Sequence, residues 1–513
     1  MKLEFDLSLY LVTDSTMVPA GKTLAETVDQ AIQGGVTIVQ LREKSTDTSD
    51  FIATARAVQS ITRKANVPLL INDRIDVALA IDADGVHIGQ DDMPLSEARR
   101  LLGPHKIIGV SVQTCSEAEI AVRGGADYLG IGTCYSTNTK AVKVGPQGPA
   151  GIRAVWEHAL QVSEPLCKVR AVTIGGVNQY NVAHVLNYAC AVNGTCLDGV
   201  AVVSAIMAAP DPRLAAQVLQ QQISTARQTS GLRPKYDIDH VSQRVAAMFA
   251  QSKTGSITPL VQHITNSVVI NDCANACLAL GGSPIMAAEV EEQADLARVV
   301  NALVINIGTL GTEQVAGMRE AMRHANLHQT PIILDPVAVG ATTHRMQVVD
   351  EMIRDFGICV IKGNAGEIAA LAGSAEMKMR GVDAVGTGFA DPVAVVKQVA
   401  LRHRCVVVMT GVVDYVSDGT NTFAVRNGHK LQSVITGSGC MVGTALGTFI
   451  HSVAKEAPVI GALTGILAIN IAAEVAANRS DVRGPGTFRA AFIDSMHNLT
   501  TEQFNAHTNF SIL

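Results

Sequence analysis

Short apolar runs alternate with amphipathic stretches through the first half of the chain, from Leu7 to about Ala216. The runs are four to six residues long, which is too short for a helix and typical of strands buried on both faces. The stretches between them repeat apolar residues every three or four positions, as a helix packed by one face does. The predicted strands are Leu7–Val12, Thr37–Leu41, Pro68–Ile71, Gly85–Ile88, Ile107–Val112, Tyr128–Ile131, Val169–Ile174 and Gly199–Val202, and predicted helices include Leu24–Gln33, Asp50–Ala65 and Ser96–Leu102.

Eight strand–helix units in about 215 residues favour a closed (β/α)8 barrel, the TIM barrel, over the alternative of a doubly wound open sheet. The second half also alternates strands and helices, and its strands leave through glycine-rich loops. That pattern predicts an open α/β sheet with a ligand site along the carboxyl ends of the strands. The expected elements are a helix at Val241–Gln251, strands at Leu303–Leu310, 332–335, Cys359–Ile361 and Val406–Met409, and a helix entered from Gly437–Gly443.

The stretch Ser224–His240 separates the two halves and has no sustained apolar periodicity. It combines Gly231, Pro234 and mixed charge, which is typical of a connection. A chain of 513 residues also exceeds what one core supports. We therefore expect a first domain at 1–225, a linker at 226–240 and a second domain at 241–513; a long surface loop inside one large domain is the alternative.

Composition narrows the class of protein. Hydrophobic residues make up 48% of the chain and the mean hydropathy is +0.24, so membrane spans have to be considered. The charge-free runs Leu431–Ile450 and Ala457–Ala473 are interrupted by Gly, Pro, Asn, Ser and Thr, which predicts buried helices and no membrane partner. A net charge of −6 argues against a nucleic-acid surface. The ten cysteines are scattered, with only Cys273 and Cys277 close in sequence, so we expect mostly buried thiols and a cytoplasmic protein.

Polar residues follow almost every predicted strand of the first half, where barrel enzymes place their sites. Each alone could be a solvated charge or a helix cap, but together they favour a site. Arg42, Lys44 and Lys140 could meet a highly anionic group, and Asp73 and Asp92 are the hard oxygen ligands that Mg²⁺ takes beside phosphates. Glycines after the seventh strand and Ser204 after the eighth match a phosphate site. The sequence thus predicts a diphosphate, magnesium and a second phosphate.

The motifs QLREK, IND, HIGQxD, GVS and TxTK resemble thiamine phosphate synthase over about residues 5–220. The resemblance implies that hydroxymethylpyrimidine diphosphate and thiazole phosphate condense to thiamine phosphate and pyrophosphate, with Arg42, Lys44 and Lys140 catalytic and Asp73 and Asp92 holding Mg²⁺. Ser136 replaces the Pro that usually precedes TxTK. By the same match the pyrimidine diphosphate would contact Gln40, Arg42, Lys44, Asn72, Ser111 and Lys140, and the thiazole phosphate would contact Thr137, Asn138, Thr139, Gly176, Val203 and Ser204.

The loop Thr436–Cys440, TGSGC, is the strongest signal of the second half. Its glycines let backbone N–H groups and the following helix start point at an anion. Asp335 and Glu367 could order Mg²⁺ through water, and Lys362 could meet phosphates. The sequence contains no GxxxxGK[ST], so it is not a P-loop protein.

The motifs TNxV, LGxSPxM, NIGTL, LDPV, KGNxxEI, TGxVD and TGxGC resemble hydroxyethylthiazole kinase, of the ribokinase-like class, over about residues 255–510. Cys440 would be the catalytic base, and its place near a helix start should favour the thiolate. Lys362 stands where many relatives have Arg, and Ala338 replaces a common Gly. The match implies that Asn266, Met286 and Gly437 contact the thiazole alcohol, that Lys362 and Thr410 contact ATP, and that Asp335 and Glu367 serve the metal.

Together the halves resemble the bifunctional thiamine-biosynthetic enzymes of fungi. The resemblance implies a kinase product that is the synthase's second substrate, Mg²⁺ and ATP as requirements, small-molecule partners and a homo-oligomer, trimeric or higher. Other enzymes on the same folds, a ligand sensor without turnover and a pair of assembly domains are the alternatives. The QLREK and carboxylate pattern argues against other enzymes, and the retained catalytic residues argue against a sensor.

Overall fold

The computed structural model describes residues 4–137, 145–163, 169–229, 233–255, 258–373, 378–380, 383–385, 389–454 and 456–513. The chain forms two compact units, Met1–Gly231 and Leu232–Leu513. Each has its own hydrophobic core, as expected for a chain too long for a single core.

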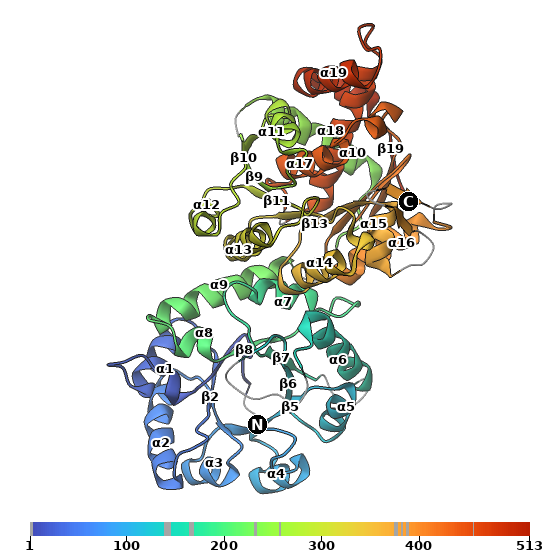
Figure 1. Ribbon diagram of the computed structural model, residues 1–513. Helices are drawn as coiled ribbons and strands as arrows, with labels where there is room; N and C mark the ends of the chain where they lie inside the picture. The colour runs from blue at the N-terminus through green and yellow to red at the C-terminus, as the bar shows by residue number, and fades with distance from the viewer. Residues whose placement is uncertain are drawn as a thin grey trace. The chain divides into compact units, whose positions relative to one another are not determined.

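The first unit is a closed barrel of eight parallel strands with helices around it (Figure 1). The barrel closes where β8 pairs with β1, with Leu9 beside Val200. This confirms the predicted (β/α)8 fold. The strands are β1 (Leu9–Val12), β2 (Ile38–Leu41), β3 (Leu69–Asn72), β4 (Gly85–Ile88), β5 (Ile107–Val112), β6 (Tyr128–Gly132), β7 (Ala171–Ile174) and β8 (Gly199–Val202); the helices are α1 (Leu24–Gln33), α2 (Thr48–Lys64), α3 (Ile75–Ile81), α4 (Leu95–Leu102), α5 (Cys115–Arg123), α6 (Gly148–Ser163), α7 (Val182–Tyr188), α8 (Ser204–Met207) and α9 (Pro212–Thr229).

Alternation along each strand divides the side chains between the barrel interior and the helices. In β1, Leu9 and Leu11 belong to the core under the helices, whereas Tyr10 belongs to the interior cluster. Tyr128 of β6 fills the interior beside it, and the neighbouring strand makes room with Gly109, where a Cβ would lie 2.0 Å from the Tyr128 ring. The barrel interior therefore contains two tyrosine side chains, each with a polar hydroxyl group.

The second unit is built on a nine-stranded sheet in the order β10-β9-β11-β12-β13-β16-β17-β18-β19. The first six strands in that order are parallel and the last three are antiparallel. Four of the parallel strands, β11, β12, β13 and β16, match predicted strands, whereas β9, β10 and the antiparallel strands were not predicted. The α/β class is confirmed. The strands are β9 (Leu260–Ile264), β10 (Ser283–Ile285), β11 (Ala302–Asn306), β12 (Ile332–Asp335), β13 (Val360–Asn364), β16 (Val406–Thr410), β17 (Asp414–Ser417), β18 (Thr422–Val425) and β19 (Phe510–Ile512), with β14 (Lys378–Arg380) and β15 (Asp383–Val385) forming a separate pair.

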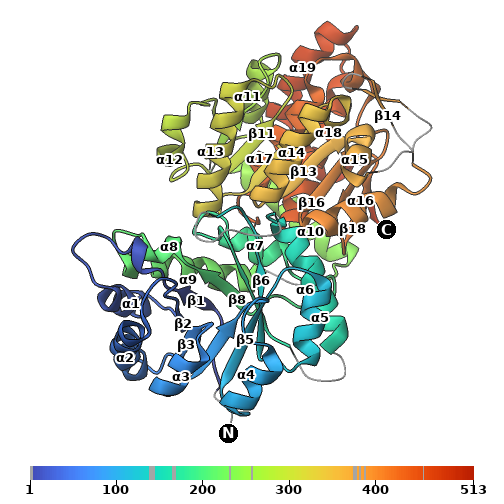
Figure 2. The same cartoon turned by 60° about the horizontal axis from the view of Figure 1, so that its bottom comes forward.

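Helices cover both faces of this sheet (Figures 1 and 2). Phe249 of the first helix, α10, stacks on Phe504 of α20 with 4.0 Å between ring centroids. One face carries α10 (Ile238–Lys253), α11 (Ile270–Ala279), α17 (Ser438–Ile450) and α18 (Pro458–Ala477), with α19 (Pro485–Asn498) and α20 (Thr501–His507) packed on them, and the other carries α13 (Thr312–His328), α14 (Thr343–Asp355), α15 (Ala365–Ala372) and α16 (Pro392–His403); the short α12 is Gln293–Leu296.

Helix α18 is the one helix in the described part of the chain with the length and apolar content of a membrane span. Seventeen of its 20 residues are buried inside the unit, as predicted for Ala457–Ala473. The preceding charge-free run, Leu431–Ile450, is only partly α-helical: the α-helix begins at Ser438, within the predicted helix entry Gly437–Gly443. Gly437 before it has φ +89°, which interrupts the helical conformation.

The predicted linker 226–240 is partly helical. Helix α9 runs on to Thr229, and α10 begins at Ile238. Between them, Asn421 in the turn after β17 donates to the Pro234 carbonyl (2.8 Å) and accepts from the Tyr236 N–H (2.9 Å). The end of the linker is thus attached to the second unit.

The cysteines differ from the expectation in one respect. Cys190 and Cys196, which are six residues apart, form a disulfide with an S–S distance of 2.04 Å that was not predicted. Cys273 and Cys277 are buried free thiols, as predicted.

Candidate active sites

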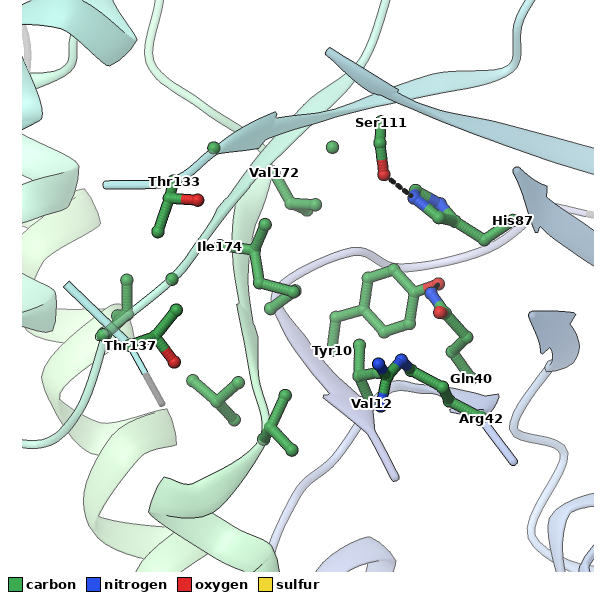
Figure 3. A pocket seen from close by; sticks show the side chains of 18 of the residues that line it. Tyr10, Val12, Gln40, Arg42, His87, Ser111, Thr133, Thr137, Val172 and Ile174 are labelled. Atoms are coloured by element: carbon green, nitrogen blue, oxygen red, sulfur yellow. Dashed lines mark hydrogen bonds between the residues drawn. The ribbon is translucent and has the colours of Figure 1, made fainter. Parts of the chain in front are cut away.

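A pocket of about 140 Å³ opens at the carboxyl ends of the barrel strands. Figure 3 shows Tyr10, Gln40 and Arg42 on one side of it and Thr133 and Thr137 on the other. The predicted residues that line the pocket are Gln40, Arg42, Asn72, Ser111, Thr137, Gly176, Val203 and Ser204. Three further predicted residues, Asn138, Thr139 and Lys140, lie outside the described residues.

Two carboxylates and a lysine lie at the ends of β2, β3 and β4. Lys44 Nζ is 2.6 Å from Asp73 Oδ2, and the Gly89 N–H donates to Asp92 Oδ2 (2.7 Å). Burial and a hydrogen bond shared with Asp73 raise the pKa of Asp92. Two carboxyl groups held this close favour a bound cation, and hard oxygens fit Mg²⁺. Within the described ranges no cluster of three or more His, Cys, Asp or Glu side chains has the geometry of a metal site, so further ligands would be substrate oxygens or water.

Arg42 is oriented by Asp14, a residue that the sequence analysis missed. The guanidinium Nη1 is 3.7 Å from Asp14 Oδ2, and the Arg42 N–H donates to Thr13 Oγ1 (3.0 Å). Asp14 lies two residues after the end of β1, so its position just beyond a strand end was a usable signal.

The floor of the pocket carries a continuous chain of hydrogen bonds. Gln40 Nε2 donates to the Tyr10 hydroxyl (2.6 Å), which is 2.7 Å from the Tyr128 hydroxyl. Tyr128 in turn is 2.7 Å from His87 Nδ1, and His87 Nε2 is 2.8 Å from Ser111 Oγ. Burial raises the pKa of both tyrosines, so both are neutral. The sequence gives no functional signal for either tyrosine, because each lies inside an apolar run.

The loop after β7 passes close to the loop after β6. Gly175 and Gly176 have φ +104° and +65°. A Cβ on Gly175 would lie 2.3 Å from Thr133 Cγ2, and one on Gly176 would lie 2.7 Å from Tyr135 Cβ. Both positions therefore require glycine, and they leave backbone groups facing the pocket beside Ser204. A phosphate here remains a prediction.

The second site lies where β9, β11, β12 and β13 end. Asn306 Nδ2 donates to Asp335 Oδ2 (2.7 Å) and lies 3.3 Å from Cys440 Sγ. Asn266 Nδ2 donates to Asn306 Oδ1 (2.9 Å) and is 3.5 Å from the same sulfur. Lys362 Nζ is 3.0 Å from Asp335 Oδ1. Four predicted residues thus form one cluster, and the missed Asn306 joins them.

Glu367 is positioned by the start of α15. It forms a capping box with Asn364, and its oxygens accept from the N–H groups of Asn364 (2.7 Å) and Ala338 (2.9 Å). Burial raises the pKa of Glu367 to about 7, with Lys362 opposing the shift. Ala338 has φ +56°, a conformation that the glycine common at this position would adopt without strain. Both carboxylate oxygens of Glu367 already accept hydrogen bonds from backbone N–H groups. Glu367 therefore suits a role in which it contacts Mg²⁺ through a water molecule.

Cys440 is the third residue of α17, after Gly437 at the N-cap. Burial, followed by the Asp335 charge, raises the pKa of the Cys440 thiol to about 11. This is opposite to the thiolate expected from a helix start, because desolvation and a neighbouring anion outweigh Lys362 and the two asparagine donors. Burial opposes the charge on Lys362, but Asp335 and Glu367 raise its pKa, so it remains a cation.

Two predicted contacts stand apart from this cluster. Thr410 ends β16, and its Oγ1 is 3.4 Å from the Gly363 carbonyl, one residue from Lys362. Met286 follows β10 at the edge of the sheet, one strand away from Asn266.

The turn after Thr410 is held by a buried carboxylate. Asp414 accepts from the Gly411 N–H (2.8 Å) and from Asn470 Nδ2 of α18 (2.6 Å). Burial raises the pKa of Asp414 to about 6. Asn470 thus connects this turn to α18, a helix that is otherwise mostly apolar.

Asp414 should make the second unit less stable as pH rises from about 4 to 6. The pKa of this carboxyl is 3.8 in the unfolded chain and about 6 in the folded one. Between these values the folded state binds more protons than the unfolded state, so the free energy of unfolding falls by about 3 kcal/mol as pH rises across this window. Urea unfolding of Asp414→Asn, followed from pH 4 to 7, should lack that slope. Asp295→Asn, at an exposed position, is the control; an unchanged slope in Asp414→Asn would contradict the assignment.

Comparison with known families matches each unit separately. Residues 9–206 match the family model "Thiamine monophosphate synthase", and residues 252–502 match "Hydroxyethylthiazole kinase family".

Relatives with both halves also exist. The chain is 42% identical to a "Probable thiamine biosynthetic bifunctional enzyme" of Schizosaccharomyces pombe, over 99% of this chain and 98% of the relative. It is 38% identical to the "Thiamine biosynthetic bifunctional enzyme" of Saccharomyces cerevisiae, over 98% and 97%. A "Hydroxyethylthiazole kinase" of Desulfatibacillum aliphaticivorans is 42% identical over 48% of this chain and 89% of its own length.

Proposed function

This chain belongs to the bifunctional thiamine biosynthetic enzymes, and we propose that each of its two sites catalyses one of two successive reactions. The second unit phosphorylates 4-methyl-5-(2-hydroxyethyl)thiazole with ATP. The first unit condenses the resulting thiazole phosphate with hydroxymethylpyrimidine diphosphate, and thiamine phosphate and pyrophosphate are the products.

The Asp73–Asp92 pair beside Lys44 is the observation that carries the synthase assignment. Loss of pyrophosphate from the pyrimidine methylene develops negative charge on the leaving oxygens. Lys44 and Arg42 stabilise that charge as it forms. Mg²⁺ held by the two aspartates would neutralise the diphosphate further.

The remaining barrel residues bind the two substrates. Gln40, Asn72 and Ser111 hold the pyrimidine. The glycine turn at Gly176, with Val203 and Ser204, receives the thiazole phosphate together with Thr137. The predicted roles of Asn138, Thr139 and Lys140 remain part of this proposal.

In the kinase unit, Asn266, Gly437 and Met286 bind the thiazole alcohol next to Cys440. Lys362 and Thr410 meet the ATP phosphates, and Asp335 and Glu367 order Mg²⁺ through water. Phosphoryl transfer depends mainly on the positions of the reacting groups and on stabilisation of their charge. The substrate hydroxyl therefore needs to lose little of its proton before it is phosphorylated. A protonated Cys440 thiol is compatible with that course.

Cys440→Ala should lower the kinase turnover number about 10-fold and leave the KM for ATP and the synthase unchanged. Cys440→Asp supplies a carboxylate and should restore turnover, more fully at higher pH, since burial beside Asp335 opposes its ionisation. Initial rates of both variants from pH 6 to 9 test this. Equal turnover in the alanine variant, without gain in the aspartate variant, would make Cys440 a packing residue.

One incubation tests the whole function: hydroxyethylthiazole, Mg·ATP and hydroxymethylpyrimidine diphosphate, with thiamine phosphate as the readout. Omitting ATP should stop the reaction, and supplying thiazole phosphate should restore it. A ligand sensor would bind these compounds without turnover.

We also propose a cytoplasmic protein that self-associates through its kinase unit and acts on small molecules, with no membrane or nucleic-acid partner. Exposed apolar side chains support the self-association: Val268 and Leu278 are 65% and 57% exposed.

A further inference from the structure

The hydrogen-bond chain under the synthase pocket crosses five different strands. Gln40 comes from β2, Tyr10 from β1, Tyr128 from β6, His87 from β4 and Ser111 from β5. The first four side chains are at most 9% exposed. Figure 3 shows the Gln40 amide beside the Tyr10 hydroxyl and Ser111 beside the His87 ring. The two ends of the chain, Gln40 and Ser111, both line the pocket.

Each group in the chain can give only the protons it has, so with the Gln40 amide nitrogen facing Tyr10 the hydrogen bonds run in one direction. Gln40 Nε2 can only donate, so the Tyr10 oxygen accepts and its proton goes to Tyr128. The Tyr128 proton then goes to His87 Nδ1. The imidazole must therefore carry its own proton on Nε2, which donates to Ser111 Oγ. The Ser111 proton is left for the pocket, as is the Gln40 carbonyl oxygen.

Two other arrangements would give a different proton order: the first needs the Gln40 oxygen, and not its nitrogen, to face Tyr10, and the second leaves one buried proton without an acceptor. Rotation of the Gln40 amide would reverse every bond, protonate His87 on Nδ1 and commit the Ser111 proton to the ring. A charged imidazolium would donate to Tyr128, which would then donate to Tyr10. Tyr10 would accept twice, and its own proton would have no acceptor among the described residues of the barrel interior.

We propose that Tyr10, Tyr128 and His87 are positioning residues that make the pocket present one acceptor, on Gln40, and one donor, on Ser111. This pattern is complementary to a 4-aminopyrimidine, whose amino group donates and whose ring nitrogen accepts. In this arrangement the Nδ1 of His87 accepts from Tyr128 and its Nε2 carries the proton. The proposal deepens the proposed synthase function and rests on it for the identity of the ligand.

Nitrogen NMR of the full-length protein labelled with ¹⁵N-histidine tests the proton order without any substrate. His87 is assigned by comparison with His87→Gln. At pH 7 we expect the His87 Nδ1 signal in the unprotonated range and Nε2 in the protonated range. A proton on Nδ1, or on both nitrogens, would overturn the proposal.

Tyr128→Phe tests the positioning role. It removes the link between Tyr10 and His87 and keeps the ring. We expect mixed His87 tautomers and a KM for the pyrimidine diphosphate raised about 10-fold, with an unchanged KM for thiazole phosphate and unchanged kinase activity on the same chain. Tyr188→Phe, a tyrosine of α7 outside the pocket, is the matched control.

Unchanged tautomer and KM in Tyr128→Phe would overturn the positioning role. If the parent protein condensed no substrates at all, the proposed function would fail, whereas the NMR measurement would still decide the proton order.

Discussion

Asp73→Asn is expected to reduce the condensation rate at least about 100-fold and to leave ATP-dependent phosphorylation of the thiazole unchanged. Asp73 lies against Lys44 and Asp92 and directly follows Asn72, which lines the barrel pocket. Without its charge the site loses half of its carboxylate pair, and Mg²⁺ should bind more weakly. Asparagine is the suitable replacement, because Asp73 has φ +62° and asparagine adopts that conformation almost as readily.

The matched control is Asp76→Asn, three residues on, where the carboxylate is exposed and paired with Arg74. Both variants should be assayed for both activities over a Mg²⁺ titration. The control should keep both activities. Equal loss of synthase and kinase activity in a folded Asp73→Asn protein would refute independent sites.

Lys362→Met should abolish kinase activity and destabilise the second unit by about 3–5 kcal/mol. Lys362 is 4% exposed and Asp335 is fully buried, so the substitution leaves a buried carboxylate without its cation. A lone buried carboxylate takes up a proton more easily. The loss of stability should therefore grow as pH rises and shrink in acid.

Denaturant unfolding at pH 5 and pH 8, with synthase activity measured in parallel, tests this expectation. Lys235→Met, at an exposed position in the connection before α10, should leave both properties unchanged. If Lys362→Met were as stable as the parent protein at pH 8, the ion pair would have no structural role.

The sequence predicted the parallel elements of the fold well, because their signals are local. The observed β4 and α1 have the predicted bounds, Gly85–Ile88 and Leu24–Gln33, since each apolar pattern is bounded by turn residues. Parallel strands also share one carboxyl edge, so strand order along the chain is enough to bring residues such as Gln40 and Ser111 to the same end of the barrel.

The missed features depend on contacts between distant parts of the chain. Tyr10 and Tyr128 are 118 residues apart in sequence, and no local pattern indicates that their hydroxyls meet. In the sequence, Asn306 is simply the last residue of a strand. Only the fold places Asp335 and Cys440 beside it. The Cys440 thiol was misjudged for the same reason: the helix start was visible in the sequence, and its burial beside a carboxylate was not.

Short or interrupted elements were the other source of error. The strands β17 to β19 are three or four residues long, and β17 contains the polar residues Asp414 and Ser417. Length alone was not the obstacle, because four-residue strands such as β8 were predicted; the polar residues of β17 interrupt the apolar run by which a buried strand is recognised. Helices α9 and α10 continue into the predicted linker because charged and polar residues are compatible with an exposed helix face.

The stacking of Phe249 on Phe504 ties the beginning of the kinase unit to residues made much later on the ribosome. Every element of the barrel precedes Arg233, so the synthase can fold while the rest is still being translated. The core of the kinase cannot close until Phe504 has emerged, some 275 residues after Thr229. At about 5–20 residues per second this delay is about 14–55 s. For that time a finished synthase is tethered to an unfinished kinase, whose apolar α18 is also among its last helices to be made.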